Sequence, residues 1–502
     1  MPALANRRDS MSAREPERGD HRSVAVVGAG ITGLVTAYEM RRRGVNVTLF
    51  ESSGHSGGAI RTTCTEGFLA EHGPNSFVTS APVESLLTQL DLQDEVVEAN
   101  PHANRRYVVR NRALVPFPIT PPAMLGTRLF SLRAKLRVLL EPLVRRSVDD
   151  SDESIASFVR RRLGHEVLDY AVDPFISGIF AGDVETLSMA HAFPRVYALE
   201  REYGSLSKGL MAQRSAARKQ ASGTSANGGA TDAGTPAALE SQPDAGAPVR
   251  PRLISFIDGM QTLTDALEAA LAGTLRLGCP VRLLHRDEAR WIVDAGQEGA
   301  ERSRAFDAVV MATPAHVLAA MELPGDMRQH ATPVERVEYP PVSTVTLGFR
   351  RSDVTHPLDG VGMLIPSAER ETLLGALFSS SLFTDRAPED HVTITCFVGG
   401  ARSPDLARES TDVLVGRVLR ELTRLVGVRG DPVFVQHVFW PRAIPQYTVG
   451  YQTVKNAADA IERANPGLYL AGNYRNGVSV GDCVASGQEI AQRVEAYLSR
   501  AR

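Results

Sequence analysis

The pattern of hydrophobic and polar positions changes three times between residues 24 and 51. A β-branched apolar run, Val24-Ala-Val-Val27, predicts a strand. A glycine-rich segment follows, Gly28-Ala-Gly-Ile-Thr-Gly33, and then a helical periodicity to Arg43 that ends at Gly44. A second predicted strand, residues 45–50, ends on Glu51. Strand, glycine-rich turn, helix, strand and acid in this order predict a dinucleotide-binding unit.

This unit offers backbone contacts to a pyrophosphate. The glycines permit a tight turn and close approach of the backbone, and the helix N-terminus carries free N–H groups and a partial positive charge. Glu51 is placed to accept hydrogen bonds from a ribose. The candidate cofactor contacts here are Gly28, Ala29, Gly30, Ile31, Thr32, Gly33, Glu51 and Ser52.

Further segments carry turns that suit the same ligand. Paired glycines at 57–58 let backbone lie against a phosphate or ribityl chain, and Arg61 offers a charge-assisted contact. Residues 471–487 predict a strand, a glycine-rich crossing and a helix start, whose N–H groups would stabilise negative charge on a reduced isoalloxazine. The candidate contacts here are Gly57, Gly58, Ala59, Arg61, Gly73, Pro74, Asn75, Ser76, Gly472, Val478, Ser479 and Val480, with Val281 in a later strand.

The order of predicted elements indicates an α/β protein with a discontinuous nucleotide domain, because strands of the same type return at 281–284, 306–312 and 468–472. A low-complexity stretch rich in Ala, Gly, Ser, Thr and Pro reads as a flexible loop within a domain. We expect a disordered arm at 1–22, the nucleotide domain at 23–84, 251–334 and 451–502, a mainly helical region at 85–205, the flexible loop at 215–250, and a substrate domain with a mixed sheet at 335–450.

Composition narrows the class of function. The 502 residues carry a formal net charge of −3, so nothing draws the whole surface to nucleic acid. The four cysteines, Cys64, Cys279, Cys396 and Cys483, lie far apart without zinc or disulfide spacing, and we expect no metal site. No uninterrupted apolar run approaches the roughly 18 residues that a membrane-spanning helix needs.

Three narrower motifs stand beside these turns: Asp173-Pro-Phe-Ile-Ser-Gly-Ile-Phe-Ala-Gly-Asp183, Ile444-Pro-Gln-Tyr447 and Gly477–Cys483. With them the chain resembles, over about residues 23–498, the oxygen-dependent protoporphyrinogen oxidase family of the amine oxidase and phytoene desaturase superfamily. The resemblance implies a Rossmann-like FAD domain of the glutathione reductase and amine oxidase type, with FAD as cofactor. It also implies oxidation of protoporphyrinogen IX to protoporphyrin IX in haem biosynthesis, with O2 as acceptor and H2O2 as by-product.

The resemblance also assigns roles to residues outside the cofactor turns. Arg105 matches an arginine that pairs with a substrate propionate, although Arg106 beside it leaves the register open by one residue. Gly178 matches a glycine whose carbonyl faces the reacting ring, and it is the catalytic candidate. Apolar positions matched to the substrate slot are Phe397, which would stack on a pyrrole, and Leu347 and Leu377, which would be its walls.

One position departs from the family pattern. Gly450 is followed by Tyr451, where the family often has histidine, so contacts near the cofactor are expected to differ.

Residues 128–146 combine leucines at helical spacing with six basic residues and one acid. Periodicity alone favours a core-packed helix with basic flanks. The resemblance favours attachment to the cytoplasmic face of the cytoplasmic membrane, because the family binds membranes through this region. It also implies a homodimer and product transfer to a ferrochelatase. The leucines concerned are Leu129, Leu132, Leu136, Leu139, Leu140 and Leu143.

Three alternatives stay open at this point. The same flavin chemistry could act on coproporphyrinogen III, whose four propionates call for more cations than the 105–106 pair. An amine or carotenoid oxidoreductase of the superfamily would lack the narrow motifs. A non-catalytic carrier of prenylated GTPases shares the fold but would not need the intact cofactor turns.

Overall fold

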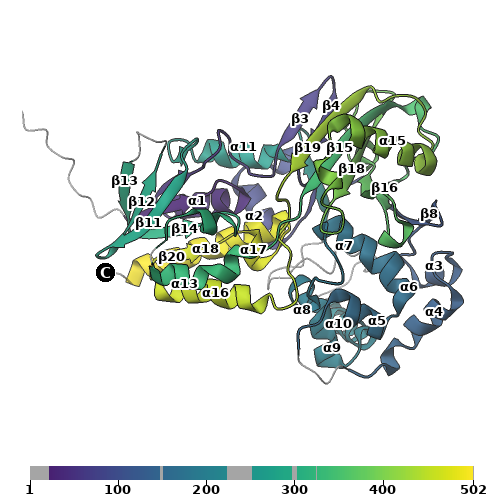
Figure 1. Ribbon diagram of the computed structural model, residues 1–502, viewed down its shortest axis with the longest axis horizontal. Helices are drawn as coiled ribbons and strands as arrows, with labels where there is room; N and C mark the ends of the chain where they lie inside the picture. The colour runs from purple at the N-terminus through teal and green to yellow at the C-terminus, as the bar shows by residue number, and fades with distance from the viewer. Residues whose placement is uncertain (1–21, 147–150, 223–250, 297–301, 324, 501–502) are drawn as a thin grey trace, which may run out of the picture.

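The computed structural model describes residues 22–146, 151–222, 251–296, 302–323 and 325–500. Figure 1 shows a nucleotide-type domain at the left, a large sheet at the upper right and a helical lobe at the lower right. The predicted arm at 1–22 lies almost wholly outside the described residues, as does the 215–250 loop beyond residue 222. Helix α10 (Leu206–Ser222) continues to Ser222, so the first residues of the predicted loop are helical.

A five-stranded parallel sheet forms the centre of the nucleotide domain, in the order β10-β2-β1-β14-β20. Alternate residues of β1 enter different cores, Val24 and Val26 on one face and Ala25 and Val27 on the other. A strand buried on both faces needs an unbroken apolar run, which is why residues 24–27 are all apolar. The strands are β1 (Ser23–Val27), β2 (Asn46–Phe50), β10 (Leu275–Arg276), β14 (Ala308–Met311) and β20 (Leu468–Leu470).

Helices cover one face of this sheet, and a small sheet with three helices covers the other. On the first face lie α1 (Ile31–Arg42), α11 (Gln261–Ala270), α18 (Val480–Arg500) and α2 (Ala81–Gln89). The second face is covered by β11 (Val281–Asp287), β12 (Arg290–Ala295), β13 (Arg302–Phe306), α12 (Val317–Ala320), α13 (Gly325–Glu335) and α16 (Gln452–Ala464). The predicted α/β fold with a discontinuous nucleotide domain is confirmed.

A seven-stranded mixed sheet, in the order β19-β15-β18-β17-β16-β7-β8, forms the second body. Its outer face packs on α15 (Thr411–Val426), and its inner face turns towards α7 (Asp173–Phe180). The strands are β7 (Arg105–Arg110), β8 (Ala113–Pro116), β15 (Val342–Arg350), β16 (Gly360–Leu364), β17 (Leu373–Leu377), β18 (His391–Gly399) and β19 (Phe434–Trp440).

The region 85–205 is therefore not helical throughout, because β7 and β8 pair into this sheet. A third strand of the region, β6 (Val96–Glu98), pairs with β9 (Leu253–Phe256), which also pairs with β5 (Phe77–Val78). The hairpin of β3 (Thr62–Thr65) and β4 (Phe68–Glu71), the short helix α14 (Ser379–Leu382) and the single turn α17 (Asn473–Asn476) complete the two bodies.

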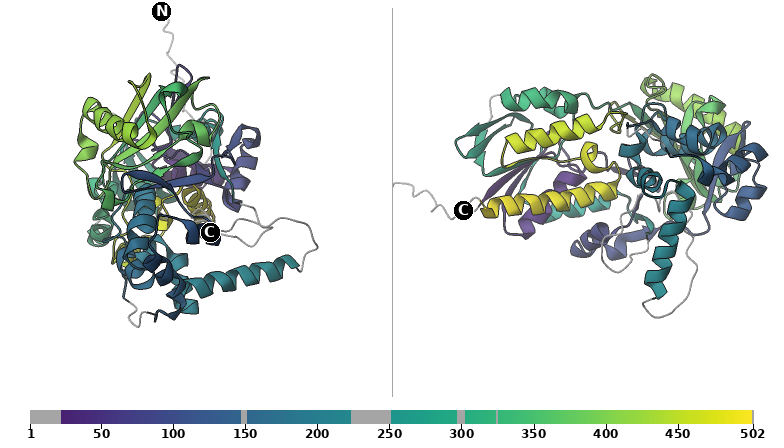
Figure 2. Two further views of the ribbon diagram at one scale, coloured as in Figure 1. Left: turned by 90° about the vertical axis from the view of Figure 1, so that its right-hand side faces the viewer. Right: turned by 90° about the horizontal axis from the view of Figure 1, so that it is seen from below.

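The helical lobe is built around a buried charge cluster. Arg162 is fully buried and donates to Glu141 at 2.7 Å and to Glu200 at 2.5 Å. Because a buried cation needs buried acceptors, this cluster fixes how its helices meet. The lobe, from which α10 projects in Figure 2, consists of α3 (Pro121–Gly126), α4 (Leu132–Leu139), α5 (Ile155–Arg162), α6 (His165–Val167), α7, α8 (Met189–Ala192), α9 (Pro194–Tyr203) and α10.

Candidate functional site

The turn between β1 and α1 is a cradle made of backbone. Gly28 has φ +99°, and a side chain there would lie 2.8 Å from the carbonyl oxygen of Ala312. A Cβ on Gly33 would lie 1.9 Å from the carbonyl oxygen of Gly28, so only glycine lets α1 start this close to β1. Gly30 precedes the first residue of α1 and has open space beside it. The free N–H groups of α1, beginning at Ile31 and Thr32, therefore face an open edge that suits a pyrophosphate.

Glu51 is fixed against this turn. Its Oε2 accepts the backbone N–H of Ala29 at 2.8 Å, and its Oε1 accepts that of Ser53 at 2.8 Å. The Ser52 hydroxyl also donates to Oε1, at 3.3 Å. Each carboxylate oxygen keeps a lone pair for further donors, so the group can accept ribose hydroxyls.

The start of β11 runs beside the same acid. Cys279 donates its N–H to the carbonyl of Glu51 at 2.8 Å, and Gly278 donates to Ser53 at 2.7 Å. Val281 begins β11 two residues later. This places Val281 near the ribose end of the cradle.

The second glycine turn closes the cradle from the side. Gly57 donates its N–H to the carbonyl of Ala29 at 2.8 Å, and a Cβ on Gly58 would lie 3.3 Å from the Cα of Gly30. Ala59 and Gly73 touch backbone to backbone, since a Cβ on Gly73 would lie 2.3 Å from the Ala59 carbonyl oxygen.

The loop after Gly73 is held to the same turn. Arg61 accepts the N–H of His72 through its carbonyl at 2.9 Å, and Asn75 donates to the carbonyl of Gly73 at 3.1 Å. The structure thus brings the 57–61 segment together with Gly73, Pro74, Asn75 and Ser76.

The C-terminal segment adds a second helix N-terminus. Ser479 donates its hydroxyl to Asp482 at 2.7 Å, and Asp482 donates its N–H back to the Ser479 oxygen at 3.1 Å, which caps α18. Burial raises the pKa of Asp482, opposed by the Ser479 hydrogen bonds. The predicted contacts Gly472, Val478 and Val480 lie around this cap.

Helices α1 and α18 cross at close range, which sets both N-termini in one body. A Cβ on Gly487 would lie 2.9 Å from the carbonyl oxygen of Thr32. The crossing explains why the last part of the chain takes part in the same site as the first.

Strand register decides which residues of the large sheet face inward. Arg106 is paired with Gly362, Gly362 with Leu377, and Leu377 with Thr395. Paired residues point to the same side of a sheet, and Phe397 lies two residues from Thr395 on that side. Arg106, Leu377 and Phe397 therefore share the inner face.

Two sequence assignments differ from this placement. Arg105 lies on the other side of β7, more than half exposed, and forms an ion pair with Asp359 at 2.6 Å. Leu347 is fully buried in the core between the sheet and α15, so it is not a wall of a slot that contains Phe397. The one-residue ambiguity at Arg105 and Arg106 is resolved by the sheet in favour of Arg106 as the inward-facing cation.

Gly178 lies in α7, which packs on β16 and β17. Its backbone is exposed among buried neighbours, and a Cβ there would lie 3.0 Å from Leu364 Cδ2. The last-turn carbonyls of a helix lack intrahelical partners, so the carbonyl of Gly178 is available to a ligand beside the inner face. A π-type turn, Leu168–Val172, leads into α7 because Pro174 has no N–H to donate.

Residues that the sequence analysis assigned to neither cofactor nor substrate hold α7 in place. Arg402 forms an ion pair with Asp173 at 2.5 Å, and Gln446 donates to the carbonyl of Phe180 at 2.9 Å. The Tyr447 hydroxyl donates to the carbonyl of Asn473, beside α18. The Ile-Pro-Gln-Tyr motif therefore links the end of α7 to the C-terminal glycine turn. The sequence marked this motif as characteristic of the family, but its residue types did not indicate this structural role.

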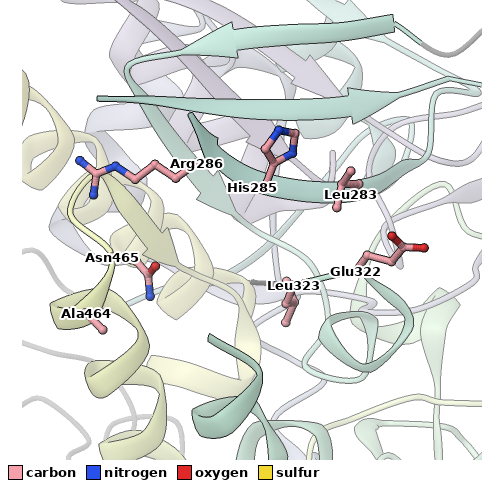
Figure 3. Close-up of a pocket in the computed structure, with 7 residues that line it drawn as sticks. All are labelled: Leu283, His285, Arg286, Glu322, Leu323, Ala464 and Asn465. Carbon is pink, nitrogen blue, oxygen red and sulfur yellow. The ribbon is translucent and has the colours of Figure 1, made fainter. Parts of the chain in front are cut away.

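An open depression of about 380 Å³ contains none of these residues, and Figure 3 shows the side chains that line it. It lies among β11, the segment after α12 and the end of α16, and includes no predicted site residue. The residues that line it are Leu283, His285, Arg286, Glu322, Leu323, Ala464 and Asn465.

The Cys483 thiol is unsuited to act as a nucleophile. Burial raises the pKa of the Cys483 thiol to about 11, which keeps it protonated. No group of three His, Cys, Asp or Glu residues suited to a metal occurs among the described residues.

The chain is similar to known proteins over most of its length. Residues 31–495 match the family model of flavin-containing amine oxidoreductases. The chain is 35% identical to the mitochondrial protoporphyrinogen oxidase of Nicotiana tabacum over 97% of both chains. It is 28% identical to the coproporphyrinogen III oxidase of Bacillus subtilis, covering 95% of this chain and 98% of that one.

Solved structures show the same fold. A proposed protoporphyrinogen oxidase from Exiguobacterium sp. 255-15 has a TM-score of 0.76 at 24% identity, over 95% of this chain and 99% of that one. Reduced UDP-galactopyranose mutase has a TM-score of 0.68 at 15% identity, over 95% and 96%.

Proposed function

The chain belongs to the flavin-containing amine oxidoreductase family, and from this membership we propose that it oxidises protoporphyrinogen IX to protoporphyrin IX with FAD as cofactor, O2 as acceptor and H2O2 as by-product. The observation that carries the proposal is the 35% identity to tobacco mitochondrial protoporphyrinogen oxidase across 97% of both chains. The enzyme would act in porphyrin and haem biosynthesis.

The residues of the cradle fit FAD. Backbone N–H groups at the start of α1 suit the pyrophosphate, and Glu51 suits the adenosine ribose. The capped N-terminus of α18 would stabilise negative charge on the reduced ring system. When bound, FAD supplies a hydride acceptor, so the protein needs to bind and orient the substrate.

The inner face of the large sheet supplies this orientation. Phe397 and Leu377 offer a half-buried apolar surface for the pyrrole rings of the macrocycle, and Arg106 offers a charge-assisted contact for a propionate. Gly178 would present its carbonyl oxygen as an acceptor to a pyrrole N–H or a polarised C–H of the reacting ring.

Anaerobic mixing tests the proposal. Purified FAD-loaded protein is mixed with protoporphyrinogen IX or coproporphyrinogen III while flavin absorbance is followed. Rapid bleaching by protoporphyrinogen, with peroxide formed once air is admitted, is expected. No bleaching by either compound would contradict a porphyrinogen oxidase.

Coproporphyrinogen III is the second candidate substrate, favoured by the 28% identity to the Bacillus subtilis enzyme. Arg106 and Arg110 both point to the inner side of β7, and two cations are fewer than four propionates call for, which favours protoporphyrinogen. Faster bleaching by coproporphyrinogen at equal concentration would reverse this order.

Peripheral membrane attachment is the second part of the proposal, on the cytoplasmic face of the cytoplasmic membrane. Leucines that a core-packed helix would bury are exposed on and around α4: Leu132 is 82% exposed and Leu143 is 77% exposed. Arg128, Arg133, Arg145 and Arg146 are exposed beside them. We define the leucine patch as Leu125, Leu132, Leu136, Leu139, Leu140 and Leu143.

The patch differs from the sequence pattern at two positions, because Leu129 is fully buried and Leu125, which lies outside that pattern, is exposed. No helix of the described residues is both long and apolar enough to cross a bilayer. A basic, apolar surface of this kind suits an anionic bilayer surface. Homodimer formation and transfer to a ferrochelatase stay predictions.

A further inference from the structure

A small cavity lies behind the wall formed by Leu377. It has room of about 10 Å³, close to the space that one water molecule needs. Leu377 borders it on the side of the expected substrate, and Asn75 borders it on the side of the cofactor turns. Polar groups of Glu71, Ser379 and Arg386 complete the lining, so a water there would have hydrogen-bond partners.

Glu71 is the buried carboxylate of this cavity, 4% exposed. Its Oε1 accepts the N–H of Met260 at 2.8 Å, and its Oε2 accepts the hydroxyl of Thr62 at 2.7 Å. Burial raises its pKa to about 7, opposed by these two hydrogen bonds and by Arg386. A carboxylate in this state exchanges a proton near neutral pH.

The charged groups around Glu71 come from two packed segments. Arg386, before β18, is the cation that lowers the pKa of Glu71, and its guanidinium donates to Ser255 and to the carbonyl of Phe256. Asp258 and Asp385 act on Arg386 in turn. The β3 and α14 neighbours, Thr62 and Ser379, are neutral.

Ser379 connects the cavity to a row of hydroxyls under the inner face. Its Oγ lies 2.9 Å from Thr395 Oγ1, which lies 3.1 Å from Thr346 Oγ1. Each of these contacts can form with either oxygen as the donor. A chain whose donors and acceptors can reverse is able to pass a proton.

We propose that Glu71 receives the proton released from the substrate in each two-electron step, through the Ser379 hydroxyl and one water in this cavity. The proposal rests on the porphyrinogen oxidation proposed above. Over three steps, three bridging carbons each lose a hydride, and the protons come from two pyrrole N–H bonds and from a C–H bond of the fourth bridging carbon. In each step one hydride, which carries two electrons, and one such proton leave the substrate. That proton forms the O–H bond of the Glu71 carboxyl group.

The proton returns when O2 is reduced. Peroxide formation takes two electrons and two protons, one of which left the substrate within the hydride. Glu71 supplies the other and returns to its carboxylate form. Glu71 acts through water and Ser379 and touches neither substrate nor reacting atoms.

Two measurements test this role. Infrared titration of the resting FAD-loaded enzyme is expected to show a protonated carboxyl band with a midpoint near pH 7, absent in Glu71→Gln. Anaerobic bleaching by protoporphyrinogen IX is expected to accelerate as pH rises through the same midpoint, because the carboxylate form accepts the proton. We expect Glu71→Gln and Ser379→Ala each to slow bleaching at pH 8 by about 10-fold or more and to remove the pH dependence.

Matched variants separate the relay from a structural role. Ser379→Ala leaves Glu71 in place, so its infrared titration persists while bleaching loses the pH step. Thr62→Val removes a hydrogen bond that lowers the pKa of Glu71, so the midpoint moves to higher pH and the plateau rate is kept.

Three results have separate meanings. If the wild type bleaches and Glu71→Gln bleaches with the same pH profile, the relay is overturned and the proposed function stands. If the wild type shows no titrating carboxyl band and Glu71→Gln is less stable, the relay is also overturned. Glu71 would then have a structural role only. A wild type that no porphyrinogen bleaches would overturn the proposed function together with the relay.

Discussion

The carboxylate of Glu51 accepts the backbone N–H of Ala29 at 2.8 Å, which ties the acid after β2 to the glycine turn after β1. The glycine turn and Glu51, which would hold the pyrophosphate and the adenosine ribose of FAD, are therefore joined in one structural unit. Glu51→Ala is expected to weaken FAD binding by about 10- to 100-fold, the range for hydrogen bonds to a charged group. FAD titration of apoprotein measures this, with Glu66→Gln, an exposed carboxylate of the β3–β4 turn, as the charge-matched control.

Gly33→Ala is expected to prevent folding of the nucleotide domain, because its Cβ would lie 1.9 Å from the Gly28 carbonyl oxygen. Gly30→Ala has open space at its Cβ and an ordinary φ of −69°. This variant should match the apoprotein's Tm but bind FAD weakly, since the open space is where the pyrophosphate would lie. Thermal unfolding and FAD titration of both variants measure this. A Gly30→Ala variant that lost stability together with FAD affinity would contradict the proposed position of the pyrophosphate.

Arg106→Ala is expected to raise KM for protoporphyrinogen by about 10-fold or more, the cost of a lost charge-assisted contact, with a smaller effect on kcat. Arg105→Ala is the neighbouring control, because Arg105 lies on the other side of β7 beside Asp359. Steady-state kinetics of both variants measure this. A larger KM effect from Arg105 would reverse the assignment.

Replacing Leu132, Leu136, Leu139 and Leu143 by serine is expected to abolish binding to anionic liposomes, since burying each leucine side chain contributes about 1.5–3 kcal/mol. Activity in detergent should persist because the site lies elsewhere. Flotation measures binding, and Val413→Ser with Leu277→Ser, exposed on the other two bodies, is the control. Equal flotation of the patch variant would exclude the patch as the membrane surface.

Stability of the helical lobe should depend on acid pH through Glu141. Burial opposes its ionisation, but hydrogen bonds from Ser205, Ser207 and Leu206 lower its pKa to about 2. A lowered carboxyl pKa contributes stability that is complete above the ordinary 4.5 and is lost as pH falls towards 2. Urea unfolding between pH 3 and pH 6 should show this decline.

The matched variant is Glu141→Gln. It should lose the pH dependence attributed to Glu141 and about 3–5 kcal/mol of stability at neutral pH, because Arg162 loses a buried counter-charge. A variant as stable as the wild type would show that the cluster does not hold the lobe together.

The sequence by itself determined the cofactor cradle. Its glycines are required by local backbone conformation and by contacts within one strand–turn–helix unit, as at Gly28 and Gly33. The apolar run of β1 and the acid after β2 follow from the same short segment. These features need no knowledge of distant parts of the chain, so their pattern could be read directly.

Only the tertiary structure decided which residues face the substrate. In strands buried on both faces, such as β15, the apolar pattern does not distinguish one side from the other, so Leu347 looked equivalent to Leu377. The choice between Arg105 and Arg106 depends on the pairing of β7 with β16, where the register shifts between Gly360 and Gly362. The exposure of the leucine patch likewise depends on what packs beside α4, because helical periodicity is the same for a core and for a membrane surface.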